Sequence, residues 1–330
     1  MTMKLVKLAI AAGMTAGLFA TASTASAATT LRLACPSAPT NPTCLAATRF
    51  AEQAAELSNG SLEIKVFPSG QLAKGKAAIQ QTSAGIIDLV VEDISNYGNF
   101  NADYNVVSWG FTFRDAGHFD RFLKSPVHQR MADALRDQHG LRLLAANWRK
   151  LPRVVVSTKP VFTPVDVKGL KFRVPGIPSY IKTWETVGAN PASVPWGESF
   201  QALKTGVVDA MESPFDSVVS QKFHLAAPYV TQTNHVYAAI SLAINETKYQ
   251  ALTEDEQAAL AEAASRATDY SVELAEASAA QVAAKITGDG GFVIAINPAP
   301  FQHLLAEAAE QQETDGLWAK GLMAEIQAIE

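Results

Sequence analysis

The chain has 330 residues, and its 27 lysines and arginines against 32 aspartates and glutamates give a net charge of −5 at pH 7. A mildly acidic chain without a run of basic residues binds nucleic acids poorly, so that class of partner is excluded. Beyond the N-terminal segment, no apolar run approaches the roughly 20 residues that a membrane-spanning helix needs.

The N-terminal segment has the order of a secretory signal peptide. Lys4 and Lys7 form a positive region, an apolar stretch follows over residues 8–20, and an A-x-A sequence ends at Ala27. An uncleaved membrane anchor is the alternative, but the apolar stretch is short for one. We expect cleavage after Ala27 and a periplasmic protein. Residues 1–27 hold two lysines and no acid, which leaves 25 basic and 32 acidic residues and a mature net charge of −7.

The first part of the mature chain predicts an α/β domain. Strands alternate with helices in the order strand, helix, strand, helix, strand, at residues 31–34, 44–58, 61–68, 69–85 and 86–93. The signals are alternating apolar residues for the strands and Asn59-Gly60 as the end of the first helix. This order is typical of a largely parallel sheet.

A second α/β unit begins near residue 150. Its strands are predicted at residues 153–158, 170–175, 190–195 and 207–213, and its helices at 163–169, 179–188 and 196–206. Two such units suggest two lobes with a cleft between them, since the mature chain is longer than one hydrophobic core usually serves.

The longest predicted helix starts at a capping box formed by Thr253 and Glu256 and continues to residue 286 without Gly or Pro. At 1.5 Å per residue it would be about 50 Å long, enough to run along both lobes. Two shorter helices are the alternative. A strand over residues 290–298 and a helical tail follow.

The two cysteines, Cys35 and Cys44, are nine residues apart, which excludes the C-x-x-C spacing of redox and zinc sites. In an oxidising compartment they could form a disulfide; two separate buried thiols are the alternative.

The sequence contains no recognisable catalytic machinery. There is no H-E-x-x-H, G-x-S-x-G or P-loop sequence, and no two of the six histidines are spaced to share a metal ion on a helix. We therefore expect no enzyme, no cofactor and no metal site. A secreted enzyme without a recognisable motif remains the alternative.

Charged residues near predicted strand ends are the candidates for a binding site. Arg173 stands near the carboxyl end of its strand, where open α/β sheets bind ligands, and a guanidinium can hold a carboxylate with two hydrogen bonds. Arg153 precedes it by 20 residues, and Trp196 stands at a strand-to-helix junction. Glu92 and Asp93 end a buried strand, where they either accept hydrogen bonds from ligand hydroxyls or cap the next helix.

Several segments together resemble the solute-binding proteins of TRAP transporters (tripartite ATP-independent periplasmic transporters). They are VFPSGQL at residues 66–72, GLKFRVPG at 169–176, the long segment 187–214 and TNHVY at 233–237. The resemblance implies an α/β, two-lobed periplasmic binding protein fold with a hinge cleft and a long helix spanning both lobes. We assign residues 28–150 and about 239–278 to lobe I, and 151–238 and about 279–330 to lobe II.

The resemblance also implies a function. The family captures an organic acid between the lobes and delivers it to a two-component membrane permease, so we expect a carboxylate ligand, with a sugar acid favoured by the paired acids. We also expect TRAP permease subunits as partners and a monomeric protein. The binding protein of an ATP-driven importer is the alternative from the same structural class.

The family pattern further implies roles for individual residues. The central arginine maps to Arg173, the second arginine to Arg153, the aromatic against the ligand to Trp196, and the acidic position to Asp93 with Glu92 beside it. Ser213 stands where the family usually has an asparagine that clamps the carboxylate, and this departure puts the clamp in doubt. Phe215, two residues further, completes the expected ligand-binding set.

Overall fold

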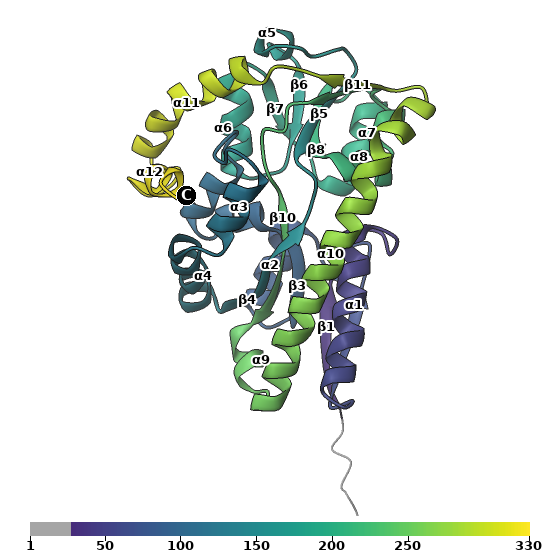
Figure 1. Ribbon diagram of the computed structural model, residues 1–330, viewed down its shortest axis with the longest axis vertical. Coiled ribbons are helices and arrows are strands. Elements are labelled where there is room, and N and C mark those ends of the chain that lie inside the picture. The colour runs from purple at the N-terminus through teal and green to yellow at the C-terminus, as the bar shows by residue number, and fades with distance from the viewer. Residues whose placement is uncertain (1–27) are drawn as a thin grey trace, which may run out of the picture.

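The computed structural model describes residues 28–330, so the predicted signal peptide lies outside the described residues. The strands form two sheets, one in each lobe (Figure 1). The sheet of lobe I has the order β2-β1-β3-β10-β4, with β1 Thr29–Ala34, β2 Leu62–Phe67, β3 Leu89–Asp93, β4 Leu141–Arg149 and β10 Ala239–Asn245. The sheet of lobe II has the order β11-β9-β5-β8-β6-β7, with β5 Arg153–Ser157, β6 Lys171–Val174, β7 Asn190–Ser193, β8 Ala210–Pro214, β9 Tyr229–Gln232 and β11 Phe292–Ala295.

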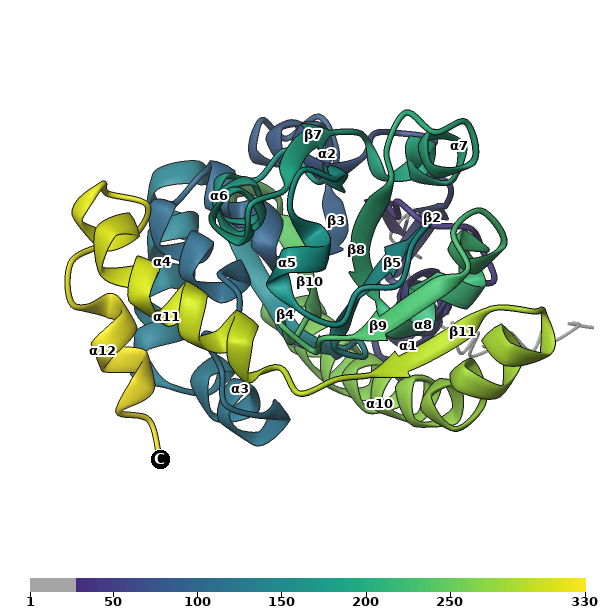
Figure 2. The ribbon, with the colours of Figure 1, turned by 90° about the horizontal axis from the view of Figure 1, so that it is seen from above.

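Helices cover the faces of both sheets (Figures 1 and 2). The α-helices are α1 Pro42–Leu57, α2 Gly75–Ser83, α3 Ala116–Leu123, α4 Pro126–His139, α5 Pro164–Val167, α6 Pro178–Val187, α7 Ser199–Lys204, α8 Phe215–Ser220, α9 Glu246–Gln250, α10 Glu254–Gly288, α11 Ala299–Thr314 and α12 Leu322–Gln327. Short 3-10 helices are η1 Ile94–Asn99, η2 Ala102–Ser108, η3 Trp196–Glu198 and η4 Phe223–Leu225. Within residues 28–330, none of the helices is both long and apolar enough to cross a membrane.

The long helix α10 has 35 residues and begins at the predicted capping box, in which Thr253 and Glu256 exchange hydrogen bonds. It contacts α1 and β4 of lobe I and, further along, α8 and β11 of lobe II. Figure 1 shows it running beside both sheets. The predicted two-lobed α/β fold with a helix spanning both lobes is therefore confirmed.

The chain crosses between the lobes in extended segments. Residues 150–152 connect β4 to β5, and residues 233–238 connect β9 to β10. The two segments meet where the Arg153 N–H donates to the carbonyl of Val236 over 2.8 Å. Strands β5 and β10 enter their sheets in the reverse direction, and each is antiparallel to both of its neighbours. The sheets are consequently mixed, whereas the sequence pattern predicts largely parallel ones.

The C-terminal tail contacts both lobes. Helix α11 packs against α6, and α12 then reaches η2, near which the Trp318 and Trp109 rings lie 5.7 Å apart. The limits that we assign to the lobes, including 279–330 in lobe II, remain a proposal.

A disulfide joins Cys35, just after β1, to Cys44 in the first turn of α1, with Cα atoms 5.9 Å apart. It closes the loop that leads from β1 into α1, and both cysteines are buried. The disulfide therefore connects the start of this loop covalently to α1, which packs on the sheet of lobe I.

Candidate ligand-binding site

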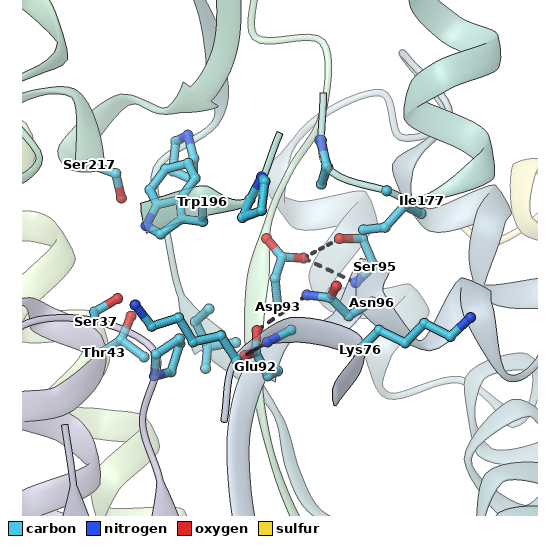
Figure 3. A pocket seen from close by; sticks show the side chains of 18 of the residues that line it. Ser37, Thr43, Lys76, Glu92, Asp93, Ser95, Asn96, Ile177, Trp196 and Ser217 are labelled. Atoms are coloured by element: carbon cyan, nitrogen blue, oxygen red, sulfur yellow. Dashed lines mark hydrogen bonds between the residues drawn. The ribbon is translucent and has the colours of Figure 1, made fainter. Parts of the chain in front are cut away.

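A cavity of about 410 Å³ lies between the two lobes (Figure 3). Its walls come from the loop before α1, from α2, β3 and η1 in lobe I, and from β6, η3 and α8 in lobe II. The charged side chains in its lining are Lys74, Lys76, Glu92, Asp93, Lys150, Arg153 and Arg173. Their individual partners decide which charge is available to a ligand.

Arg173 is the buried cation of the cavity that has no carboxylate partner within residues 28–330. Its side chain is 1% exposed, Nε donates to the carbonyl of Val194 over 2.9 Å, and Nη1 is buried without a hydrogen-bond partner. The guanidinium lies 5.5 Å from the centre of the Trp196 ring. Burial lowers the pKa of Arg173 to about 10, so the side chain still carries its charge at neutral pH.

Arg153 has the opposite environment. Its Nε and Nη2 both donate to the carboxylate of Glu212, the latter over 3.0 Å, and Nη1 donates to Asp93 over 2.9 Å. Burial by itself would lower the pKa of Arg153, but Glu212, the Tyr180 phenol and Asp93 raise it above its usual value. Its charge is thus compensated by the protein, and the bond to Asp93 joins the two lobes.

The paired acids of β3 line the cavity and also cap neighbouring elements. Asp93 accepts hydrogen bonds from the backbone N–H and hydroxyl of Ser95 and so caps η1. Glu92 accepts from the backbone N–H of Gly75 over 2.6 Å, at the start of α2, and from the amide of Asn96 over 3.2 Å. Burial raises the pKa of Glu92 to about 7, although the bond from Gly75 opposes this effect. Asp93 thus caps the helix that follows it, whereas Glu92 bonds to α2, which precedes it in the chain; both acids line the cavity.

The lysines, like the arginines, differ in whether a carboxylate of the protein compensates their charge. Lys150, in the connection between the lobes, forms a buried ion pair with Asp216 of α8. Lys74 and Lys76 are exposed, and they flank the first residue of α2. Lys74 extends over Gly70 and brings its ammonium close to Gly197 of lobe II.

Two of the predicted site residues do not line the cavity. Ser213 is fully buried and donates its hydroxyl to the carbonyl of Pro214 over 3.0 Å. Successive side chains of a strand point to opposite faces, so Ser213 shares the face of Met211, which packs in the core of lobe II. Phe215 belongs to that core as well. Trp196 does line the cavity and packs edge-on against Phe223.

Comparison with known proteins identifies the family. The model of the bacterial extracellular solute-binding protein family 7 matches residues 34–315. The chain belongs to this family. Among the relatives of this solute-binding protein, the 2,3-diketo-L-gulonate-binding periplasmic protein of Escherichia coli is 32% identical over 258 residues, which cover 77% of each chain.

Solved structures of TRAP periplasmic solute-binding proteins superpose on this family member over nearly their whole length. One from Roseobacter denitrificans with bound β-D-glucuronate has a TM-score of 0.87 and 28% identity, and the match covers 92% of this chain and all of the other. One from Sulfurospirillum deleyianum with bound succinate has a TM-score of 0.85 and 25% identity, with the same coverage.

Sequence reasoning on this solute-binding protein missed several residues of the site. Glu212, the partner of Arg153, lies beside Ser213 in a segment that the prediction used, and strand alternation would have placed it on the face opposite Ser213. The hydroxyls of Thr43 and Ser217 line the cavity but carry no sequence signal of their own.

Proposed function

We propose that this solute-binding protein captures a small organic acid in the cavity between its lobes, with the ligand carboxylate on Arg173. The observation that carries the proposal is a buried guanidinium with an unpartnered Nη1 at the wall of an interlobe cavity. A buried charge without a partner is costly, and a carboxylate is the anion whose geometry matches the guanidinium fork.

The relatives support an acid as ligand. Two of the matched structures contain bound glucuronate and succinate, and the Escherichia coli relative is a 2,3-diketo-L-gulonate-binding protein; all three ligands are carboxylates. Trp196, under the guanidinium, offers an apolar ring against which the ligand carbon skeleton packs. Closure of the lobes on such a ligand is a shift in population towards the conformation in which both lobes contact the ligand.

Location and partners follow from the same family membership. We propose that the segment 1–27 directs export, that cleavage follows Ala27, and that the mature protein releases its ligand to a TRAP-type membrane permease. The relatives of this chain include periplasmic proteins that bind 2,3-diketo-L-gulonate and C4-dicarboxylates.

A thermal-shift screen of the mature protein against organic acids tests the proposal, followed by calorimetric titration of each hit. A ligand at 100 times its dissociation constant stabilises the folded protein by about 2.7 kcal/mol, which is readily detected. Sugar acids, dicarboxylates and keto acids belong in the panel, and neutral sugars of equal size serve as controls. Stabilisation by neutral sugars alone, with no acid binding, would contradict the proposal.

A further inference from the structure

We infer that the cavity contains a hydroxyl-recognising subsite, formed by Ser37 and Thr43 of the disulfide-bridged loop and by Ser217 of α8. The subsite selects acids that carry several hydroxyl groups. The inference rests on the proposed function, because it presumes that Arg173 holds the carboxylate of the same ligand.

The first observation is that the hydroxyls of the subsite lack partners. Thr43 is 5% exposed and Ser217 is 3% exposed, yet neither side-chain oxygen forms a hydrogen bond within residues 28–330, although both line the cavity. All the other buried serines and threonines in that range have a bonded hydroxyl: Thr82, Ser95, Ser108, Thr112, Ser157, Ser179, Thr183, Ser199, Ser213, Thr231, Thr233, Ser241 and Ser271. The oxygens of Thr43 and Ser217 are not among the side-chain atoms that are sealed from solvent without a partner, so they open into the cavity, where an occupant can bond them.

The second observation is that the three residues face one part of the cavity. In Figure 3, Ser37 and Thr43 lie close to each other with Ser217 above them, and Asp93 lies on the other side of Trp196 in this view. The loop and α8 are also joined directly, because a residue between Ser37 and Thr43, Asn41, donates its amide to Ser220 over 3.1 Å. The subsite therefore draws on both lobes.

The third observation is that the loop is held rigid. The disulfide fixes both of its ends, the Asn41 side chain accepts from the Thr43 backbone N–H over 3.0 Å, and the carbonyl of Ser37 accepts from the Ser69 N–H over 2.7 Å. Groups that are already ordered lose little entropy when a ligand binds, so preorganisation raises affinity. Cys35 and Cys44 thus act as positioning residues for the subsite.

The chemistry of the subsite favours hydroxyls over a second carboxylate. Serine and threonine hydroxyls each donate and accept, which complements alcohol groups, whereas a buried carboxylate needs a cation. Three lysines also line the cavity. Asp216 already compensates the charge of Lys150, and Lys74 and Lys76 are exposed, so they do not supply a buried cation. A polyhydroxylated monocarboxylate, such as a hexuronate or an aldonate, satisfies these conditions.

The test compares D-glucuronate, D-galacturonate and L-galactonate with tetrahydropyran-2-carboxylate, which has the ring and carboxylate of a hexuronate but no hydroxyls. Titration calorimetry, by displacement where binding is weak, gives each affinity. We expect the wild-type protein to bind at least one sugar acid about 10-fold or more tightly than the hydroxyl-free acid. The isosteric Thr43→Val variant and the Ser217→Ala variant should each weaken the sugar acid about 3- to 10-fold, and the double variant about 10- to 100-fold.

Affinity for tetrahydropyran-2-carboxylate should change less than about 2-fold in these variants, since the lost bonds do not involve the carboxylate. Thr48→Val is the matched control, because Thr48 is exposed on the same helix and bonds to the carbonyl of Cys44. The Cys35→Ala/Cys44→Ala double variant should lower the preference for the sugar acid; a loss shared equally by both ligands would mean that the disulfide is structural only. Circular dichroism checks the folding of each variant.

The outcomes separate the two proposals. If the wild-type protein binds succinate or tetrahydropyran-2-carboxylate at least as tightly as every sugar acid, the subsite is refuted while acid capture stands. Equal weakening of both ligand types by Thr43→Val and Ser217→Ala would also refute it. If no carboxylate binds at all, the proposed function itself fails.

Discussion

Replacing Arg173 by methionine should abolish ligand binding without destabilising the ligand-free protein. Burial lowers the pKa of this guanidinium from its usual value to about 10. At about 1.4 kcal/mol for each tenfold change in proton affinity, the charge costs the folded state about 3 kcal/mol at every pH below 10, and the cost disappears only above the usual pKa of an arginine. Methionine removes this cost but loses the bond to Val194, which offsets about 1 kcal/mol. The free energy of unfolding should therefore rise by roughly 1–3 kcal/mol.

Binding should change in the opposite direction. Removing one member of a buried charge pair costs about 3–5 kcal/mol, a loss of roughly 200- to 5,000-fold in affinity. Arg173→Lys should also bind poorly, because an ammonium keeps the charge but lacks the planar fork. Urea unfolding and titration calorimetry with the best acid from the screen measure the two effects.

The matched control is Arg142→Met, at an arginine outside the cavity that forms a two-pronged ion pair with Glu246. That pair is partly exposed, so its loss should lower stability by about 1 kcal/mol and leave affinity unchanged. Near-wild-type affinity in a folded Arg173→Met protein would refute the carboxylate anchor. A stability loss in Arg173→Met larger than that in the control would refute the view that this charge is held for the ligand.

Four further outcomes are expected. Burial raises the pKa of Glu92 from 4.5 to about 7. The contribution of this side chain to the free energy of unfolding is therefore full below pH 4.5 and is lost as the pH rises through 7. The free energy of unfolding of the wild type relative to that of Glu92→Gln should fall by about 3 kcal/mol across that window. A difference that does not depend on pH would mean that the pKa of Glu92 is not raised in the folded protein. Arg153→Met should lower the unfolding free energy by about 3–5 kcal/mol, because it removes the cation from the buried carboxylate of Glu212 and from the partly buried one of Asp93. Urea unfolding measures this, and a stable variant would contradict it. Ellman's reagent should find no free thiol at Cys35 or Cys44 in unfolded, unreduced protein, and reduction should lower stability by about 2–3 kcal/mol in the chain-entropy model; two titratable thiols would disprove the bridge. Mass spectrometry of a periplasmic extract should find a chain that begins at Ala28, and an intact segment 1–27 in the membrane fraction would argue for an anchor.

The sequence predicts best the features that depend on local patterns. The capping box at Thr253 and the absence of Gly and Pro after it predict a helix over 254–286, and α10 covers Glu254–Gly288. Apolar alternation around Arg173 predicts a strand that ends near this residue, and β6 covers Lys171–Val174. In both cases the residues that form the element are also the ones that carry the signal.

Features that depend on distant partners could not be predicted in the same way. The direction of β5 and β10 is set by the chain crossing from one lobe to the other, and no residue within either strand encodes that crossing. The cavity-facing position of Ser217, rather than Ser213, depends on where β8 stops and α8 begins. A shift of boundary by a few residues changes which side chain points at a ligand.

The two arginines of lobe II show why spacing alone does not assign function. Arg153 and Arg173 lie on strands of the same sheet, both line the cavity, and both are more than nine-tenths buried. One is surrounded by carboxylates of the protein, so its charge stabilises the fold and connects the lobes. The other has a single carbonyl as partner within residues 28–330, so its charge is held at a cost that an external anion removes. Since the residue type and the burial are the same, the placement of Glu212 decides which arginine serves the fold and which serves the ligand.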